Sequence, residues 1–282
     1  MAQFSSIEWT THTFNPWWGC TTVSEGCRFC YAQNLATRYG HDVWGKGKER
    51  RKLSDGYWEE PLRWNNAAGI SNAMGGERPR VFCASMADVF DPEAPEGELE
   101  RLWELIRATP ELDWLLLTKR PGRIEQSLPD DWAQGYANVW LGASVEDNKV
   151  ADRARTLAQI PAHLRFLSLE PLIGPVDKVS YEGIHWAIVG GESGARPRPM
   201  QMEWVHDIHA ACRENDVAFF FKQLGTYLAR EMRCTDRKGG KWSELPVDLR
   251  IREIPGVAHT FVPQAQDEPE TETVFGGVPV GA

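Results

Sequence analysis

Residues 138–171 read NVWLGASVEDNKVADRARTLAQIPAHLRFLSLEP. The two ends of this stretch, 138–147 and 164–171, are apolar runs that finish in polar residues, as strands commonly do. The segment between them, 148–160, has a helical pattern and stops before Pro161. Strands that are apolar throughout are usually covered on both faces of a parallel sheet, and a parallel pair needs a crossover such as a helix. The stretch therefore predicts a strand–helix–strand unit of an α/β protein.

The same alternation continues in both directions along the chain. Further strands are expected at residues 80–88, 112–120, 185–192 and 217–223, with a first strand near 13–18. Helices are expected at 96–109 and at 203–215. About seven parallel strands covered by helices predict the fold class α/β, with a partial or full parallel β/α barrel.

One segment interrupts this pattern. Residues 40–79 are rich in Gly, Asn, Trp and charge and lack a long period, so we expect an inserted lid there. We expect one domain over residues 1–255. The extension over 256–282 is expected to be disordered from about residue 264, because it is rich in Pro, Gly, Glu and Thr.

Composition and charge narrow the classes of function. The 282-residue chain has a formal net charge of −9, which argues against a protein coated in basic surface for nucleic acid but is compatible with a local basic site. The N-terminus lacks a basic segment followed by an apolar one, and no apolar run approaches the roughly 18 residues of a membrane span. We therefore expect a cytoplasmic protein with no membrane partner.

Three of the six cysteines lie in one short segment, NPWWGCTTVSEGCRFCYAQNLATRYG (15–40). Cys20, Cys27 and Cys30 are separated by six and then two residues, in a loop that leads into a helix expected from Tyr31. This clustering favours metal binding in a reducing compartment over disulfides. Three thiolates can each bind one iron of a [4Fe–4S] cubane, which leaves the fourth iron without a protein ligand. An open iron can chelate S-adenosylmethionine and pass an electron into its sulfonium, which gives a 5′-deoxyadenosyl radical.

Two other interpretations of the cysteines stay open. A structural zinc site normally needs four ligands, and the nearest further candidates, His12 and His41, lie outside the cysteine run in no knuckle-like spacing. Three free thiols are the remaining alternative.

The segment resembles the cluster loop of the radical S-adenosylmethionine superfamily. The usual spacing there is three and then two residues, with an aromatic residue before the third cysteine; here the first gap is six and the aromatic is Phe29. The blocks FNPWWGC, GCRFCYA, ASMADVF, LLTKRP, WLGASVE, RFLSLEPL, WAIVGGESG and FFFKQLG, over about residues 5 to 250, resemble an uncharacterised phage and bacterial three-Cys-motif family. Members are sometimes found beside a three-Cys-motif partner protein.

This resemblance implies a barrel of the radical S-adenosylmethionine type, with a [4Fe–4S] cluster on Cys20, Cys27 and Cys30. It also implies S-adenosylmethionine as cofactor, an electron donor, and a three-Cys-motif partner protein as a candidate partner. It does not supply the substrate.

Polar side chains follow nearly every expected strand, where a parallel barrel carries its functional groups. The candidate cofactor-binding residues are Phe29, Lys119, Ser144, Glu146, Glu170, Gly190, Gly191 and Glu192.

Each of these candidates has a chemical reason. Phe29 can lie against an adenine ring, and Lys119 or Arg120 is a natural counter-ion for a carboxylate or phosphate. Ser144 and Glu146 can hold a ribose. The glycines before Glu192 let the backbone approach a ligand, although a simple strand-to-loop turn is the plainer interpretation.

Two further features of the candidates bear on their roles. The Glu192 carboxylate can accept hydrogen bonds from an amino or hydroxyl group. Glu170 lies in an apolar run, so its carboxylate needs either a partner or a ligand. No single catalytic residue is indicated.

The expected lid carries a cluster of basic and aromatic residues. Trp44, Lys46, Lys48, Arg50, Arg51 and Lys52 combine cations with an aromatic ring, as nucleic-acid channels do. A solvated loop is the alternative.

The leading hypothesis is a radical S-adenosylmethionine enzyme that modifies or repairs a nucleic-acid base or nucleotide. A non-catalytic metal-binding scaffold or nucleic-acid-binding protein is one alternative. A radical enzyme that acts on a peptide partner is another.

Overall fold

A seven-stranded parallel sheet forms the centre of the computed structural model, which describes residue 5 and residues 7–256. Its strands are β1 (His12–Phe14), β4 (Arg80–Cys83), β5 (Asp113–Thr118), β6 (Val139–Ser144), β7 (Leu164–Leu169), β8 (Trp186–Gly190) and β9 (Ala218–Gln223). They lie in chain order, and every neighbouring pair is parallel. In the described residues β1 and β9 are the two edges, so the sheet is a half-barrel, and the predicted fold class is confirmed in its partial form.

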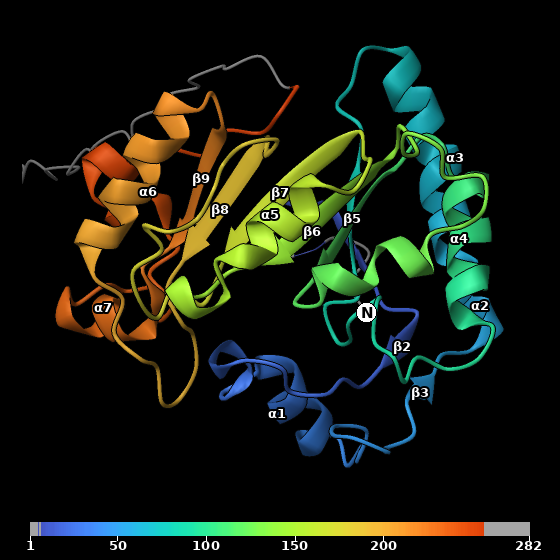
Figure 1. The fold of residues 1–282 in the computed structure, drawn as a ribbon, viewed down its shortest axis with the longest axis horizontal. Helices are drawn as coiled ribbons and strands as arrows, with labels where there is room; N and C mark the ends of the chain where they lie inside the picture. Colours follow the sequence, from blue (N-terminus) through green and yellow to red (C-terminus); the bar gives the residue numbers. More distant parts are fainter. Residues whose placement is uncertain (1–4, 6, 257–282) are drawn as a thin grey trace, which may run out of the picture.

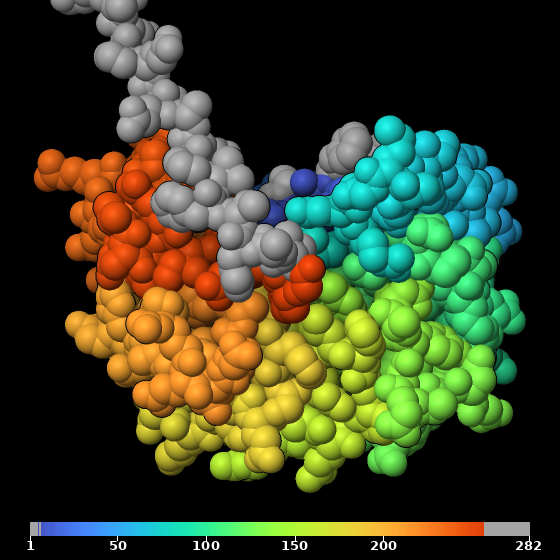
Figure 2. All heavy atoms as spheres, turned by 90° about the horizontal axis from the view of Figure 1, so that it is seen from above, coloured from blue at the N-terminus to red at the C-terminus, as the bar shows by residue number. Residues whose placement is uncertain are grey.

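Helices follow most of the strands, as the alternation predicted. They are α1 (Tyr31–Arg38), α2 (Asp55–Trp58), α3 (Glu60–Ala73), α4 (Glu98–Ala108), α5 (Asp152–Ala158), α6 (Met202–Glu214) and α7 (Gly225–Glu231). Short 3-10 turns are η1 (Glu25–Cys27), η2 (Pro121–Arg123), η3 (Glu125–Ser127), η4 (Asn148–Val150), η5 (Trp242–Glu244) and η6 (Val247–Leu249). In Figure 2 the colours follow one another around the visible face, which agrees with a chain that winds along its sheet in sequence order.

The expected helix at 148–160 illustrates how local chemistry sets an element. It starts as the turn η4, whose N-terminus is capped because Asp147 Oδ1 accepts a hydrogen bond from Lys149 N at 2.9 Å. The turn leads into α5, which ends before Pro161 because proline cannot continue a helix.

Alternate residues of strands β4 to β9 enter two different core clusters. The larger cluster packs one face against the helices and includes Leu141 and Leu167 of the strands with Leu157 of α5. The smaller cluster, on the other face, is mostly aromatic and consists of Trp9, Phe82, Leu115, Trp140, Leu164, Phe166, Trp186, Ile188 and Phe220. We call it the aromatic cluster.

The aromatic cluster fills the inner face of the half-barrel. The rings of Trp140 and Trp186 are 5.8 Å apart and near-perpendicular, which is a favourable edge-to-face arrangement. Gly142 makes room for it, because a Cβ there would lie 2.3 Å from the Phe166 ring. The inner face is therefore packed with side chains at this level.

The structure differs from the expected lid at 40–79. The fourteen-residue helix α3 lies in this segment, and Trp58, Trp64 and Ala68 are buried in the larger core cluster. The weak amphipathic pattern around Gly69 and its neighbours hid the helix, because its stability comes from packing that propensity alone does not show. The segment also contributes β3 (Arg51–Lys52), which pairs antiparallel with β2 (Trp17–Trp18).

Two remaining expectations concern the termini and the membrane. The expected disorder from residue 264 lies outside the described residues, as does nearly all of the extension over 256–282. In the described part of the chain, no helix combines the length and apolarity needed to cross a membrane.

Candidate metal and cofactor site

The three clustered cysteines lie on the loop between β2 and α1. Cys20 follows Gly19, Cys27 ends η1, and Cys30 precedes α1; none is in a disulfide and all are half-buried. Gly19 has a φ of +118°, and a Cβ there would lie 2.3 Å from Val43 O. A glycine is therefore needed for the chain to enter the loop.

Three contacts hold this cysteine loop across the carboxyl ends of β4, β5 and β6. Tyr31 Oη donates to Ser85 O at 2.7 Å, Arg120 donates to Thr21 O at 2.7 Å, and Ser24 Oγ donates to Glu146 Oε1 at 3.1 Å. Figure 1 shows α1 beyond the end of the sheet toward which β8 and β9 point. The cysteines thus occupy the edge where parallel barrels carry their functional groups.

A buried ion pair supports Cys20. Arg120 Nη1 lies 2.8 Å from Asp88 Oδ2 and 3.5 Å from Cys20 Sγ. Asp88 also accepts hydrogen bonds from Thr118 Oγ1 and Lys119 N. The guanidinium is therefore fixed while it points at the sulfur.

Burial opposes the deprotonation of Cys20 and Cys30. Burial raises the pKa of the Cys20 thiol to about 11, with the charge of Asp88 acting in the same direction and Arg120 opposing both. Burial also raises the pKa of Cys30. Metal ions bind the thiolate form, so a bound cation would have to supply the stabilisation that these sites lack.

The donor set fits a cluster with one open iron. Cys83 and Cys212 are fully buried in the larger core cluster, and Cys234 packs against it. Of the histidines considered as fourth ligands, His12 stacks on Trp64 at 4.3 Å and His41 lies against Trp18. Among the described residues no three His, Cys, Asp or Glu side chains gather as one metal ion would need. A cubane takes each thiolate on a different iron and does not require such convergence.

Glu146 is the buried anchor of the cysteine loop. Its side chain is 1% exposed and lies 3.0 Å from Arg153 and 3.5 Å from Lys119. The carboxylate also accepts the Ser24 hydrogen bond, and a Cβ on Gly26 would lie 2.5 Å from it. The structure thus pairs two of the predicted cofactor-binding residues, Lys119 and Glu146, with each other.

Gly26→Ala is expected to lower stability by about 1–3 kcal/mol, because overpacking against a pinned carboxylate forces the loop away from β6. Thermal unfolding and bound iron after reconstitution are the measurements, and both should fall. Gly122→Ala is the matched control, since a Cβ at Gly122 meets nothing within 4 Å. A Gly26→Ala protein with the melting temperature of the parent would show that Glu146 moves aside freely.

Polar residues follow the aromatic cluster toward the carboxyl ends of the strands. Ser144 lies opposite Ser168, and both are buried. Glu170 has the partner that burial demands, because Lys222 Nζ lies 3.0 Å from its Oε1. A Cβ on Gly190 would lie 2.5 Å from the same oxygen, so the glycine makes room for this ion pair.

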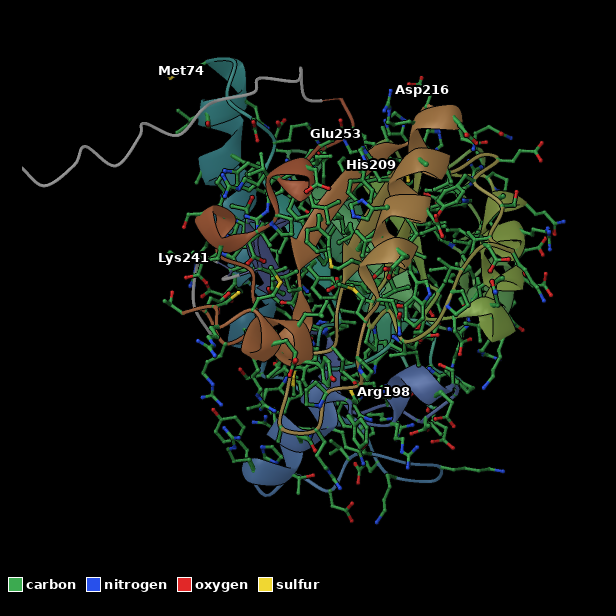
Figure 3. All side chains as sticks on the ribbon, turned by 90° about the vertical axis from the view of Figure 1, so that its left-hand side faces the viewer. Met74, Arg198, His209, Asp216, Lys241 and Glu253 are labelled. Carbon is green, nitrogen blue, oxygen red and sulfur yellow. The ribbon has the colours of Figure 1, made fainter. Side chains whose placement is uncertain are left out.

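The segment after β8 meets the cysteine loop. Glu192, 5% exposed, accepts three hydrogen bonds from Arg198, and Arg198 Nη1 donates to Glu25 O at 2.9 Å. Figure 3 shows the labelled Arg198 beside the N-terminal part of the chain. Gly191 packs against the turn before α7, since its Cβ would lie 2.2 Å from Leu224 O. These contacts give the two predicted cofactor-binding residues Gly191 and Glu192 a structural role.

Three guanidinium groups surround the Phe29 ring. Arg28, Arg196 and Arg198 have their Cζ atoms 5.4, 5.2 and 5.3 Å from its centroid. Phe29 itself is half-buried, and its contact with an adenine ring stays a prediction.

The structure corrects the expectation for Arg50. Its side chain is 0% exposed, bound by Asp91 at 2.9 Å and Glu93 at 2.8 Å, and it donates to Thr21 and to three backbone carbonyls. No donor is left for a nucleic acid.

The other members of the basic segment are exposed or partly buried. Lys48 forms an ion pair with Asp42, and Lys52 forms one with Glu98. Arg51 lies over the Trp18 ring, Trp44 packs against a small cluster that contains Trp18, and Lys46 is exposed. Most of their charges therefore already have partners.

Four residues that hold the site were not among the eight cofactor-binding residues predicted from the sequence: Asp88, Arg120, Arg153 and Arg198. Arg120 was named only as an alternative to Lys119. Two of them, Asp88 and Arg120, follow strands β4 and β5, so strand ends were the available signal. Their ion pair could not be predicted from the sequence, because 32 residues separate the two side chains along the chain.

Comparisons with known proteins place the chain in a family. No curated protein matches it. A spore photoproduct lyase variant with bound AdoMet and dinucleoside spore photoproduct is similar over 75% of this chain and 64% of its own, at 13% identity and a TM-score of 0.47. Two further variants of that lyase match at 18% and 17% identity over 61% and 55% of this chain and 49% and 44% of their own, with TM-scores of 0.41 and 0.37. The chain thus spans less than two thirds of each lyase chain.

A family model described as a protein of unknown function, DUF5131, matches residues 4–248, so the chain belongs to the DUF5131 family.

Proposed function

We propose that this protein is a radical S-adenosylmethionine enzyme that modifies or repairs a nucleic-acid base or nucleotide. Its cluster would be a [4Fe–4S] cubane on Cys20, Cys27 and Cys30. The observation that supports this most is the set of three half-buried thiols on one loop, held across the carboxyl edge of a parallel half-barrel. The remaining three cysteines pack in or against the larger core cluster.

When bound, the cluster supplies one electron for reductive cleavage of a C–S bond of S-adenosylmethionine. That chemistry requires an external electron donor. A three-Cys-motif partner protein stays a prediction.

The chain's own residues provide the surroundings that this chemistry needs. Arg120 and Glu146 fix the cysteine loop, and the Glu192–Arg198 pair ties it to the segment after β8. The aromatic cluster closes the inner face at the amino-terminal side and excludes water there. Ser144, Ser168 and the Glu170–Lys222 pair follow it and offer hydrogen bonds to a nucleoside cofactor.

The test is anaerobic purification, reconstitution with iron and sulfide, and the reduced EPR spectrum with and without S-adenosylmethionine, with 5′-deoxyadenosine assayed in the same tube. A [4Fe–4S] signal that changes on adding the cofactor, together with 5′-deoxyadenosine, is the expected result. Stoichiometric zinc and no cluster would refute the radical mechanism in favour of a metal-stabilised scaffold.

Arg120 is expected to set the reduction potential of the cluster. An N–H···S hydrogen bond stabilises the more negative, reduced state, so its removal shifts the potential to more negative values. The double variant Arg120→Met, Asp88→Asn removes the hydrogen bond without leaving an unpaired buried carboxylate. An EPR-monitored redox titration measures the shift.

Arg123→Met is the control for this titration. Arg123 carries the same charge three residues away, and it donates to Phe90 O rather than to a cysteine sulfur. Equal potentials in the double variant and the parent would show that the guanidinium does not act on the cluster.

A further inference from the structure

The ring of Phe29 brings together two chain segments that are far apart in sequence. Arg28 belongs to the cysteine loop, whereas Arg196 belongs to the segment between β8 and α6. Their Cζ atoms lie 5.4 and 5.2 Å from the centroid of the same ring. We refer to Arg28, Phe29 and Arg196 as the Phe29 surface.

The two arginines of the Phe29 surface keep their hydrogen-bond donors available. Within the described part of the chain, Arg28 is paired only with Glu25, at 3.9 Å, and both side chains are more than half exposed, so water screens the pair. Arg196 is exposed, and no ion pair with it occurs within residues 7–256. Arg198 is different, because its guanidinium donors are occupied by the Glu192 carboxylate and by Glu25 O. Arg198 therefore has a structural role.

Like charges converge here without full compensation. The separation of the Arg28 and Arg196 guanidiniums is at most the sum of their two ring distances, which is comparable with the Debye length of about 10 Å at 0.1 M salt. The buried carboxylate of Glu192 balances Arg198, and Glu25 balances Arg28 in part. An anion bound between the two guanidiniums would relieve the remaining repulsion.

We propose that the Phe29 surface binds the phosphodiester backbone of a single-stranded nucleic acid. A guanidinium presents a planar fork of donors that matches phosphate oxygens, and an aromatic ring beside such cations is where an unpaired base stacks. Two cations from separate loops near one ring suit the repeated phosphates of a strand better than a single small anion.

The location connects this surface to the proposed chemistry. Arg28 follows Cys27 directly, and Phe29 precedes Cys30, so a strand held here lies next to the cysteine loop. This inference rests on the proposed function for its catalytic meaning and names the substrate as a strand rather than a free nucleotide. It also moves the expected nucleic-acid contact away from residues 44–52, where Arg50 is buried.

The experiment is a fluorescence anisotropy titration of the full-length protein with a short single-stranded oligonucleotide over a series of salt concentrations. For Arg28→Gln with Arg196→Gln, we expect affinity to fall at least about tenfold at low salt. We also expect the slope of log K against log salt to become smaller by about 1.4, since each single-strand phosphate contact contributes about 0.7. Phe29→Leu should weaken binding without changing that slope, because stacking releases no counter-ions.

Lys46→Gln with Lys48→Gln is the matched control, because it removes the same charge from the basic segment outside the Phe29 surface. It should bind like the parent. If the lysine variant loses affinity while the arginine variant keeps the parental affinity and slope, the Phe29 surface is not the binding site. Equal competition by a polyglutamate or by a nucleoside monophosphate would overturn the assignment to a strand.

The binding result and the cluster assay can fail separately. Arginine-dependent binding by a protein that forms no cluster would keep the surface and reject the radical mechanism. A cluster that cleaves S-adenosylmethionine in a protein whose arginine variant binds strands normally would do the reverse.

Discussion

Replacing Cys20, Cys27 or Cys30 with alanine is expected to abolish the iron–sulfur cluster. Each thiolate would be the sole protein bond to one iron, so a single loss leaves two irons of the cubane without a ligand from the chain. Cys83 and Cys212 cannot substitute, because both are 0% exposed in the larger core cluster. Bound iron, acid-labile sulfide and the reduced EPR signal are the measurements, and 5′-deoxyadenosine formation should disappear with them.

Cys234→Ala is the control for the cysteine series. Cys234 is half-buried on the segment after α7 and pairs with no other cysteine. Its variant should retain iron, sulfide and signal at the level of the parent. Full cluster content in all three loop variants would show that the cluster, if one forms, is held elsewhere.

Arg50→Met is expected to lower the free energy of unfolding by about 3–5 kcal/mol, because it leaves the Asp91 carboxylate buried without its counter-ion. The change also removes hydrogen bonds to Thr21 and to the backbone carbonyls of Val43, Gly45 and Lys48. Urea unfolding should show a lower midpoint with an unchanged m-value. The cysteine loop should loosen with it, since Thr21 follows Cys20.

Lys48→Met provides the comparison for Arg50. Lys48 pairs with Asp42 at the surface, where such a pair contributes about 0–1 kcal/mol. Its midpoint should therefore stay close to that of the parent. If Arg50→Met were equally mild, the buried pair would have to be replaceable by water or by a shift of Asp91.

The elements that local chemistry controls were readable from the chain. The apolar runs at 138–147 and 164–171 became β6 and β7, and the helix between them ended before Pro161. The same holds for the helix after Cys30, which begins at Tyr31 as α1. Periodicity, proline and capping act over a few residues, so one sequence contains the whole signal.

Helix α3 shows where a local signal was too weak. Its segment has little amphipathic pattern, and Trp58 and Trp64 find their partners in a core that only the assembled sheet provides. The sequence also did not decide whether the barrel is open or closed, because the number of expected strands agreed with either form.

Some features of the candidate site were likewise predictable from the sequence, and others were not. The cysteine spacing and the polar strand ends are properties of the sequence, and they indicated where chemistry could occur. Only the tertiary structure decided that Glu146 and Glu192 would pair with arginines, that Arg50 would be buried, and that Arg196 would meet Phe29. Such contacts join residues up to 173 positions apart, as for Arg198 and Glu25, and depend on which loops meet at the edge of the sheet. A spacing along the chain cannot specify that meeting, because it results from packing of the whole core.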